Sequence, residues 1–158
     1  MNYFELFQIP VTLRVDKSGL SQKFFAIQKK YHPDFFSNAT PDEQEEALEM
    51  SALANKALKT FQNPDSTIKY ALQLKGLLEE EEKYQLAASF LMEVMELNEL
   101  KMDDADDETV QQRKDQLQIE IYEAIRPIIE NYEDGITPEN DLLKVKEYYY
   151  MKKYLDRL

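Results

Sequence analysis

The chain contains no cysteine, and its 158 residues include only one histidine and three glycines. Without cysteine, the protein forms no disulfide, offers no thiolate to a metal and has no cysteine nucleophile. One histidine without cysteine also argues against a zinc site. The scarcity of glycine, beside abundant Leu, Ala, Glu, Lys and Gln, favours helices over strands.

Positive charge is scarce as well, because 19 Lys and Arg residues face 31 Asp and Glu residues, giving a net charge of −12. Such a surface repels a phosphate backbone unless a local basic patch dominates, so we do not expect nucleic acid as a partner. No apolar run approaches the length of a membrane span. The first ten residues, MNYFELFQIP, lack the basic segment and apolar stretch of a secretory signal.

The first half of the chain predicts helices with an antiparallel pair at their centre. Apolar residues recur at spacings of four, three and four in the first long helix, and Thr40 and Pro41 suit the start of the second. The loop between them is of moderate length, which favours antiparallel packing. Helices are expected at residues 3–8, 20–31, 41–61 and 66–74, and Gly76 closes this part.

The only histidine lies in KKYHPDFF, residues 29–36, at the end of a basic amphipathic helix. Pro33 disfavours helical geometry for the residue before it, so His32 is expected in an extended or turn conformation at the helix end. No acidic residue occurs between Lys17 and His32. The outward face of this helix therefore concentrates positive charge on Lys23, Lys29 and Lys30.

These motifs, in this order, resemble a J domain, the module that stimulates ATP hydrolysis by DnaK-class chaperones. The resemblance rests on YFELFQIP (3–10), FFAIQKKYHPD (24–34) and ALANKALKTFQNPDSTIKYAL (52–72). It implies that His32, Pro33 and Asp34 dock on the ATPase domain and its linker. It also implies that Lys23, Lys29 and Lys30 face an acidic surface there, although a merely solvated face is the alternative.

The chain departs from the J-domain pattern at the residue after His-Pro-Asp. J domains commonly carry lysine there, whereas this chain has Phe35. Either one basic contact is lost, or Phe35 and Phe36 pack together on the helix pair.

The second half predicts three helices with short links, hence a bundle. The four glutamates at residues 79–82 suit a helix start because they oppose the helix dipole. The acidic segment DDADDE, 103–108, lacks the glycine and ligand spacing of an EF-hand loop, so calcium binding is not expected. The predicted helices cover residues 79–101, 108–132 with a bend near Pro127, and 139–158.

The first of these helices carries two apolar strips. Leu86, Phe90, Val94 and Leu97 suit a bundle core. The second strip has an acidic border, as in a helical docking face, but a helix buried on both sides would show the same pattern. This second strip consists of Leu91, Met92 and Met95, bordered by Glu96 and Glu99.

The last helix is rich in tyrosine. Val145, Tyr148 or Tyr149, and Leu155 form its core stripe, which leaves Tyr150 and Tyr154 beside that stripe.

A J-domain pattern followed directly by an acidic three-helix segment resembles the HscB-type co-chaperones of iron–sulfur cluster assembly. The resemblance implies an L-shaped all-α protein with a J domain at 1–76 and a scaffold-binding three-helix domain at 77–158. The segment AASFLMEVMELNEL, 87–100, resembles the family's scaffold-binding helix. The implied scaffold contacts are Leu91, Met92, Met95, Glu96, Glu99 and Tyr150.

The implied partners are a DnaK/HscA-class chaperone and an IscU-like iron–sulfur scaffold, and the expected setting is a bacterial cytoplasm. The resemblance implies no cofactor, no bound metal and no enzymatic activity of the chain itself. Two alternatives remain open. One is a J-domain protein with a different client, and the other is a helical enzyme that uses His32, for which the chain lacks a G-x-S-x-G turn.

Overall fold

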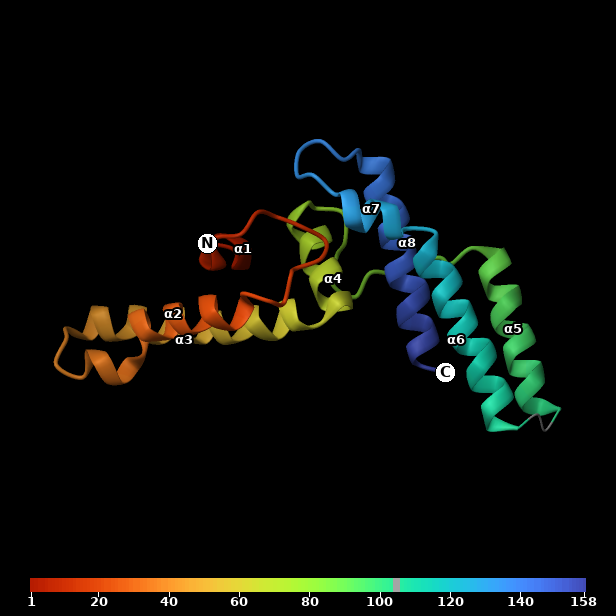
Figure 1. Ribbon diagram of the computed structural model, residues 1–158, viewed down its shortest axis with the longest axis horizontal. Coiled ribbons are helices and arrows are strands. Elements are labelled where there is room, and N and C mark those ends of the chain that lie inside the picture. The colour runs from red at the N-terminus through yellow and green to blue at the C-terminus, as the bar shows by residue number, and fades with distance from the viewer. Residues whose placement is uncertain (104–105) are drawn as a thin grey trace. The chain divides into compact units, whose positions relative to one another are not determined.

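A computed structural model describes residues 1–103 and 106–158, and neither range contains a strand (Figure 1). The predicted all-α fold class is therefore confirmed. The chain divides into two compact units, residues 1–71 and 72–158. The elements are α1 (Tyr3–Phe7), α2 (Leu20–Tyr31), the 3-10 helix η1 (Pro33–Phe36), α3 (Pro41–Gln62), α4 (Pro64–Leu74), α5 (Ala88–Met102), α6 (Asp107–Glu123), α7 (Arg126–Asn131) and α8 (Glu139–Asp156).

The core of the first unit is aromatic and lies where α1 meets α3. Phe4 and Phe7 are buried, and their ring centroids lie 5.1 and 5.4 Å from that of Phe61. Tyr3 stacks on Tyr70 of α4 at 4.3 Å, and the Tyr70 hydroxyl accepts a hydrogen bond from the Tyr3 amide. These contacts explain why a five-residue helix, too short to be stable alone, is held in place.

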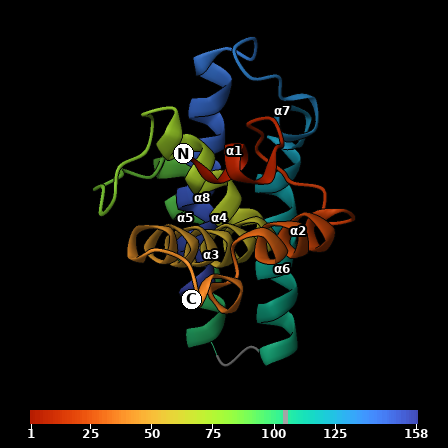
Figure 2. The ribbon, with the colours of Figure 1, turned by 90° about the vertical axis from the view of Figure 1, so that its left-hand side faces the viewer.

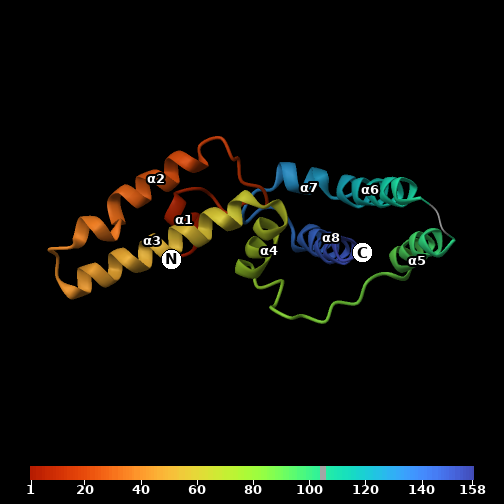
Figure 3. The same ribbon diagram turned by 90° about the horizontal axis from the view of Figure 1, so that it is seen from below.

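Helices α2 and α3 lie side by side as the antiparallel pair expected from the sequence (Figures 1 and 3), and Figure 2 shows the end at which η1 connects them. Small buried residues on α3, Ala47 and Ala54 among them, bring the helices close. A side-chain hydrogen bond links the two helices as well, since the Ser51 hydroxyl of α3 donates to Gln28 Oε1 of α2 at 2.7 Å. The apolar stripe predicted on α2 consists of Leu20, Phe24, Ile27 and Tyr31. Only Leu20 is fully buried, and the other three are half-buried.

The start of α3 has the cap predicted from the sequence. Thr40 Oγ1 accepts a hydrogen bond from the Glu43 amide at 3.2 Å, and Pro41 is the first helical residue. We expect Thr40→Ala to lower the free energy of unfolding by about 1 kcal/mol, since it leaves a helix N–H without its partner. Urea unfolding of the wild type, Thr40→Ala and Thr40→Ser measures the effect. Equal stability of all three proteins would contradict the cap's role.

In the second unit, α6 packs against both α5 and α8, and the short α7 packs against α8 (Figure 3). The predicted bend near Pro127 is confirmed, because α6 ends at Glu123 and α7 starts at Arg126. The core is formed by residues that include Phe90, Val94, Leu97, Leu117, Ile121, Val145, Tyr149 and Leu155. No helix among the described residues is long and apolar enough to span a membrane.

The predicted helix start at residue 79 is wrong, because α5 begins only at Ala88. Glu81 has a φ of 56°, in the left-handed region, and this conformation is incompatible with a continuous helix. The 79–87 segment instead contains a turn at residues 80 and 81, followed by chain without regular secondary structure. In the acidic segment 103–108, residues 104 and 105 lie outside the described ranges, and Asp106 caps α6 by accepting from the Thr109 amide.

Candidate protein-docking sites

His32 forms the corner between α2 and η1. Its amide donates to the Gln28 carbonyl at 2.7 Å and closes α2, and its backbone then turns extended, with φ −58° and ψ 129°. Pro33 enforces this change and is the first residue of η1. The prediction of an extended or turn conformation for His32 at the helix end is thus confirmed.

The imidazole and the carboxylate at this corner are exposed and face one another. His32 Nδ1 accepts a hydrogen bond from the Asp34 amide at 3.2 Å, and Asp34 Oδ2 lies 3.7 Å from the same nitrogen. The side chains are 47% and 88% exposed, respectively. Since Nδ1 is the acceptor, the neutral ring carries its proton on Nε2, where it can donate outward. A solvated pair of this kind suits a contact better than chemistry that requires water to be excluded.

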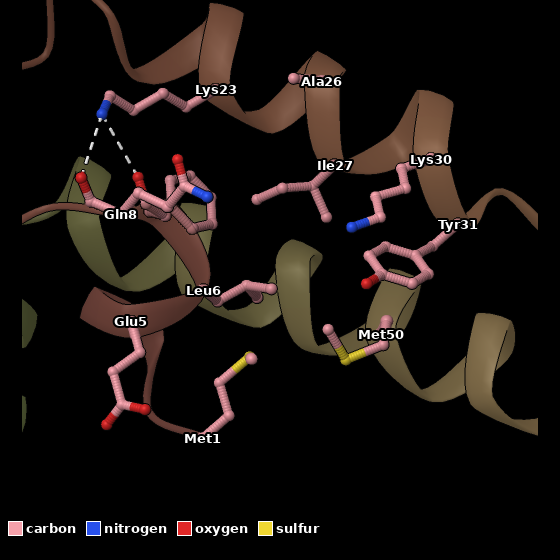
Figure 4. A pocket seen from close by; sticks show the side chains of 11 residues that line it. Met1, Glu5, Leu6, Gln8, Lys23, Ala26, Ile27, Lys30, Tyr31 and Met50 are labelled. Carbon is pink, nitrogen blue, oxygen red and sulfur yellow. Dashed lines mark hydrogen bonds between the residues drawn. The ribbon is translucent and has the colours of Figure 1, made fainter.

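The three predicted lysines are not equivalent. Lys29 and Lys30 are exposed in the last turn of α2, where positive charge is favourable beside the helix dipole. Lys23 instead donates to the carbonyl oxygens of Phe7 and Gln8 at 3.3 and 3.4 Å (Figure 4), and so links α2 to the end of α1. This end of α1 borders a pocket of about 260 Å³ whose lining includes Met1, Leu6, Ile27, Tyr31 and Met50.

The two phenylalanines after His-Pro-Asp separate. Phe36 is half-buried, and Gln44 of α3 donates to the carbonyls of Phe36 and Ser37 at 3.0 and 3.2 Å, which fixes the turn. Phe35 is 69% exposed, with its ring 5.9 Å from that of His32 in an edge contact. The residue that replaces the usual lysine therefore projects beside the histidine as an apolar surface.

Helix α5 buries one strip and exposes the other. Phe90, Val94 and Leu97 are buried. Leu91, Met92 and Met95 are 37%, 63% and 61% exposed, and Glu96 and Glu99 are also exposed. At helical spacing these five residues lie opposite the buried strip, so the alternative of a helix buried on both sides is wrong. An exposed apolar strip of this kind, with acidic neighbours, is typical of a docking surface.

Tyr150 is half-buried, whereas Tyr148 and Tyr149 belong to the core. Its ring stacks on that of Tyr84 at 4.6 Å, with 5° between the planes, and its hydroxyl lies 3.4 Å from Glu82 Oε1. Desolvation and the Glu82 carboxylate raise the pKa of Tyr150 to about 12. The sequence had indicated no role for Tyr84, and it had placed Glu82 only among the glutamates of a helix start.

Glu82 is held by Lys146 of α8, whose ammonium lies 2.6 Å from Glu82 Oε2. The Lys146 hydrogen bond, together with one from the Glu79 amide, lowers the pKa of Glu82 below its ordinary value of 4.5. The only sequence signal for this contact is weak. Lys146 and Tyr150 are four residues apart, hence on one face of α8.

We expect the Glu82–Lys146 contact to weaken in acid. A carboxyl whose pKa is lowered by folding stabilises the protein above its unfolded pKa, and this contribution is lost as the pH falls through the folded value. The difference in unfolding free energy between the wild type and Glu82→Gln should therefore be largest near neutral pH and shrink below about pH 4.5. Urea unfolding at a series of pH values measures it, and a difference independent of pH would contradict the assignment.

No group of three or more His, Cys, Asp or Glu side chains in the described part of the chain is arranged to hold a metal ion. Within the described ranges, the Glu93 Oε2 atom of α5 is buried and has no hydrogen-bond partner.

Comparison with known proteins agrees with this arrangement. The family model described as "HSCB C-terminal oligomerisation domain" matches residues 86–158. Two curated relatives, each named "Co-chaperone protein HscB homolog" and from different strains of Vibrio cholerae serotype O1, are 41% identical to this chain over 100 residues. The aligned part is 63% of this chain and 58% of each relative, so it spans less than two thirds of the relatives' length.

Solved structures of similar fold extend the match over almost the whole chain. The crystal structure of human co-chaperone protein HscB has a TM-score of 0.78 and 28% identity, and the match covers 99% of this chain and 78% of that one. Chaperone HscB from Vibrio cholerae has a TM-score of 0.64 and 28% identity, covering 99% and 96% of the two chains. The resemblance indicated by the sequence motifs is thereby confirmed, and this chain is similar to the HscB co-chaperones in sequence and in fold.

Proposed function

We propose that the chain is a co-chaperone that brings an IscU-like iron–sulfur scaffold to a DnaK/HscA-class chaperone and stimulates the chaperone's ATP hydrolysis. The proposal rests on the presence, in one HscB-like chain, of an exposed His-Pro-Asp corner and an exposed apolar strip on α5. The proposed J domain covers residues 1–76 and the scaffold-binding domain residues 77–158. The proposed setting is a bacterial cytoplasm.

The chaperone contact uses groups that the fold holds rigidly. His32 offers an Nε2 donor and Asp34 an exposed carboxylate, and Pro33 restricts the backbone between them. Little conformational entropy is lost when such a turn binds. Lys29 and Lys30 add positive charge, which increases the rate of encounter with an acidic surface more than it increases affinity.

The scaffold contact uses the α5 strip. Leu91, Met92 and Met95 offer apolar area, and methionine side chains adapt to the shape of a partner. Glu96 and Glu99 border the strip and favour a partner with basic residues around an apolar centre. Tyr150 contributes an aromatic side chain of the kind that is enriched in interface hot spots.

Two contacts in one chain act together. A scaffold bound to α5 is held near the chaperone whenever the His-Pro-Asp corner is bound, which raises its effective concentration. The chain itself needs no catalytic group for this role, because the chaperone hydrolyses the ATP.

Single-turnover ATP hydrolysis tests the proposal, using a purified DnaK/HscA-class chaperone alone, with this chain, and with this chain and scaffold. The expected result is an increase in rate on adding the chain and a further increase on adding scaffold. An unchanged rate in both cases would contradict the proposal. Stimulation by the chain that does not respond to scaffold would favour the alternative of a J-domain protein with a different client.

A further inference from the structure

The segment between α4 and α5 is fixed to α8 although it has no helical structure. Glu82 accepts from Lys146 at 2.6 Å and lies 3.4 Å from the Tyr150 hydroxyl, and the Lys146 ammonium lies 5.6 Å from the centre of the Tyr84 ring. A further hydrogen bond, from the Glu79 amide to Glu82 Oε1 at 3.0 Å, closes the turn before these contacts. Glu82 is thus fixed to α8 two residues before Tyr84, and the Lys146 ammonium and the Tyr150 ring contact Tyr84 itself.

Tyr84 and Tyr150 form a stacked aromatic pair, with centroids 4.6 Å apart and planes within 5°. Tyr84 covers one face of the Tyr150 ring, and Tyr149 meets this ring in an edge contact at 5.2 Å. The Lys153 ammonium lies 6.0 Å from the ring centre of Tyr150. A partner that reaches Tyr150 therefore finds one ring face already covered, and the aromatic surface open to it belongs to both tyrosines.

This pair is continuous with the start of α5. The three residues after Tyr84 lead directly into α5, whose first turn contacts α8 through an edge contact between the Phe90 and Tyr154 rings at 6.2 Å. Tyr154 lies one helical turn after Tyr150, and Leu91 follows Phe90. The tyrosine pair and the exposed α5 strip thus occupy neighbouring parts of the second unit.

We propose that Tyr84 is a further contact residue for the scaffold, and that Glu82 and Lys146 act as positioning residues that hold it against Tyr150. The inference rests on the proposed function, because it takes the scaffold as the occupant of this surface. The two half-buried tyrosines offer a preordered aromatic surface that loses little side-chain entropy on binding.

Binding of a purified IscU-type scaffold to the full chain, measured by titration calorimetry, tests the inference. We expect Tyr84→Ala to weaken binding about tenfold or more, as loss of an aromatic anchor does, while Tyr84→Phe stays within about twofold because it keeps the stacked ring. Phe25→Ala, which removes an exposed aromatic ring from α2, is the matched control and should bind as the wild type does.

A double-mutant cycle separates the positioning role from a general loss of stability. If Glu82 acts through Tyr84, Glu82→Gln should weaken binding in the wild type but have little effect in the Tyr84→Ala background. Thermal unfolding of each variant shows that it is folded at the temperature of the titration. Equal binding by Tyr84→Ala and the wild type would overturn the inference and leave the proposed function standing. Failure of the wild-type chain itself to bind scaffold would overturn both.

Discussion

Replacing His32 by glutamine is expected to reduce chaperone ATP hydrolysis from its stimulated rate to the basal rate. Glutamine offers an amide of similar reach, but it lacks the ring that contacts Phe35 and the Nδ1 atom that accepts from the Asp34 amide. The outward-facing donor would therefore no longer be held in place. Loss of a central contact residue weakens an interface by about 2 kcal/mol or more, or roughly 30-fold.

The fold should tolerate this change, because the His32 side chain is 47% exposed and lies at a helix end. We expect scaffold binding and thermal stability of His32→Gln to match the wild type. Asn38→Ala, at an exposed residue of the same connection, serves as the control and should stimulate normally. Full stimulation of the chaperone by His32→Gln would contradict the docking role of His32. If the chain had a catalytic activity of its own and His32→Gln abolished that activity, the enzyme alternative would be favoured.

The second large effect is expected on α5. A triple substitution of Leu91, Met92 and Met95 by alanine should reduce scaffold binding by about two orders of magnitude, because it removes most of the exposed apolar area of the strip. Alanine has the highest helix propensity, so α5 itself should persist. Titration calorimetry with purified scaffold gives the affinity, and circular dichroism gives the helix content.

The control for this experiment is a pair of exposed apolar residues outside the strip. Ile119→Ala and Ile136→Ala together remove exposed apolar area from α6 and from the turn between α7 and α8 without touching the proposed contact, and should leave affinity unchanged. If the triple variant binds scaffold as tightly as the wild type does, the strip is not the docking surface. In the absence of scaffold, the triple variant should stimulate the chaperone as the wild type does.

Features set by a few neighbouring residues could be predicted from the sequence. Helix α2 has the predicted limits, 20–31, and the His32 conformation follows from the proline after it. The Thr40 cap and the bend at Pro127 were predictable for the same reason, since capping and proline geometry act over one helical turn.

Features set by distant residues could not be predicted. The four glutamates at 79–82 have the composition of a helix start, but Glu82 pairs with Lys146, 64 positions away. Tyr84 meets Tyr150 in the same way, and Lys23, apparently free on its helix face, hydrogen-bonds the end of α1. Such contacts depend on tertiary packing, which a periodic pattern does not report.

Scaffold-dependent stimulation requires the chaperone contact and the scaffold contact in one molecule, and complementation between two defective variants tests this requirement. His32→Gln retains the scaffold contact, and the Leu91/Met92/Met95 triple alanine variant retains the chaperone contact. The two are mixed with chaperone and scaffold in single-turnover ATP hydrolysis, at a concentration where light scattering shows monomers. We predict that the mixture lacks the scaffold-dependent increase in rate seen with the wild type. Recovery of the full increase by the mixture would mean that the two contacts need not be in one molecule.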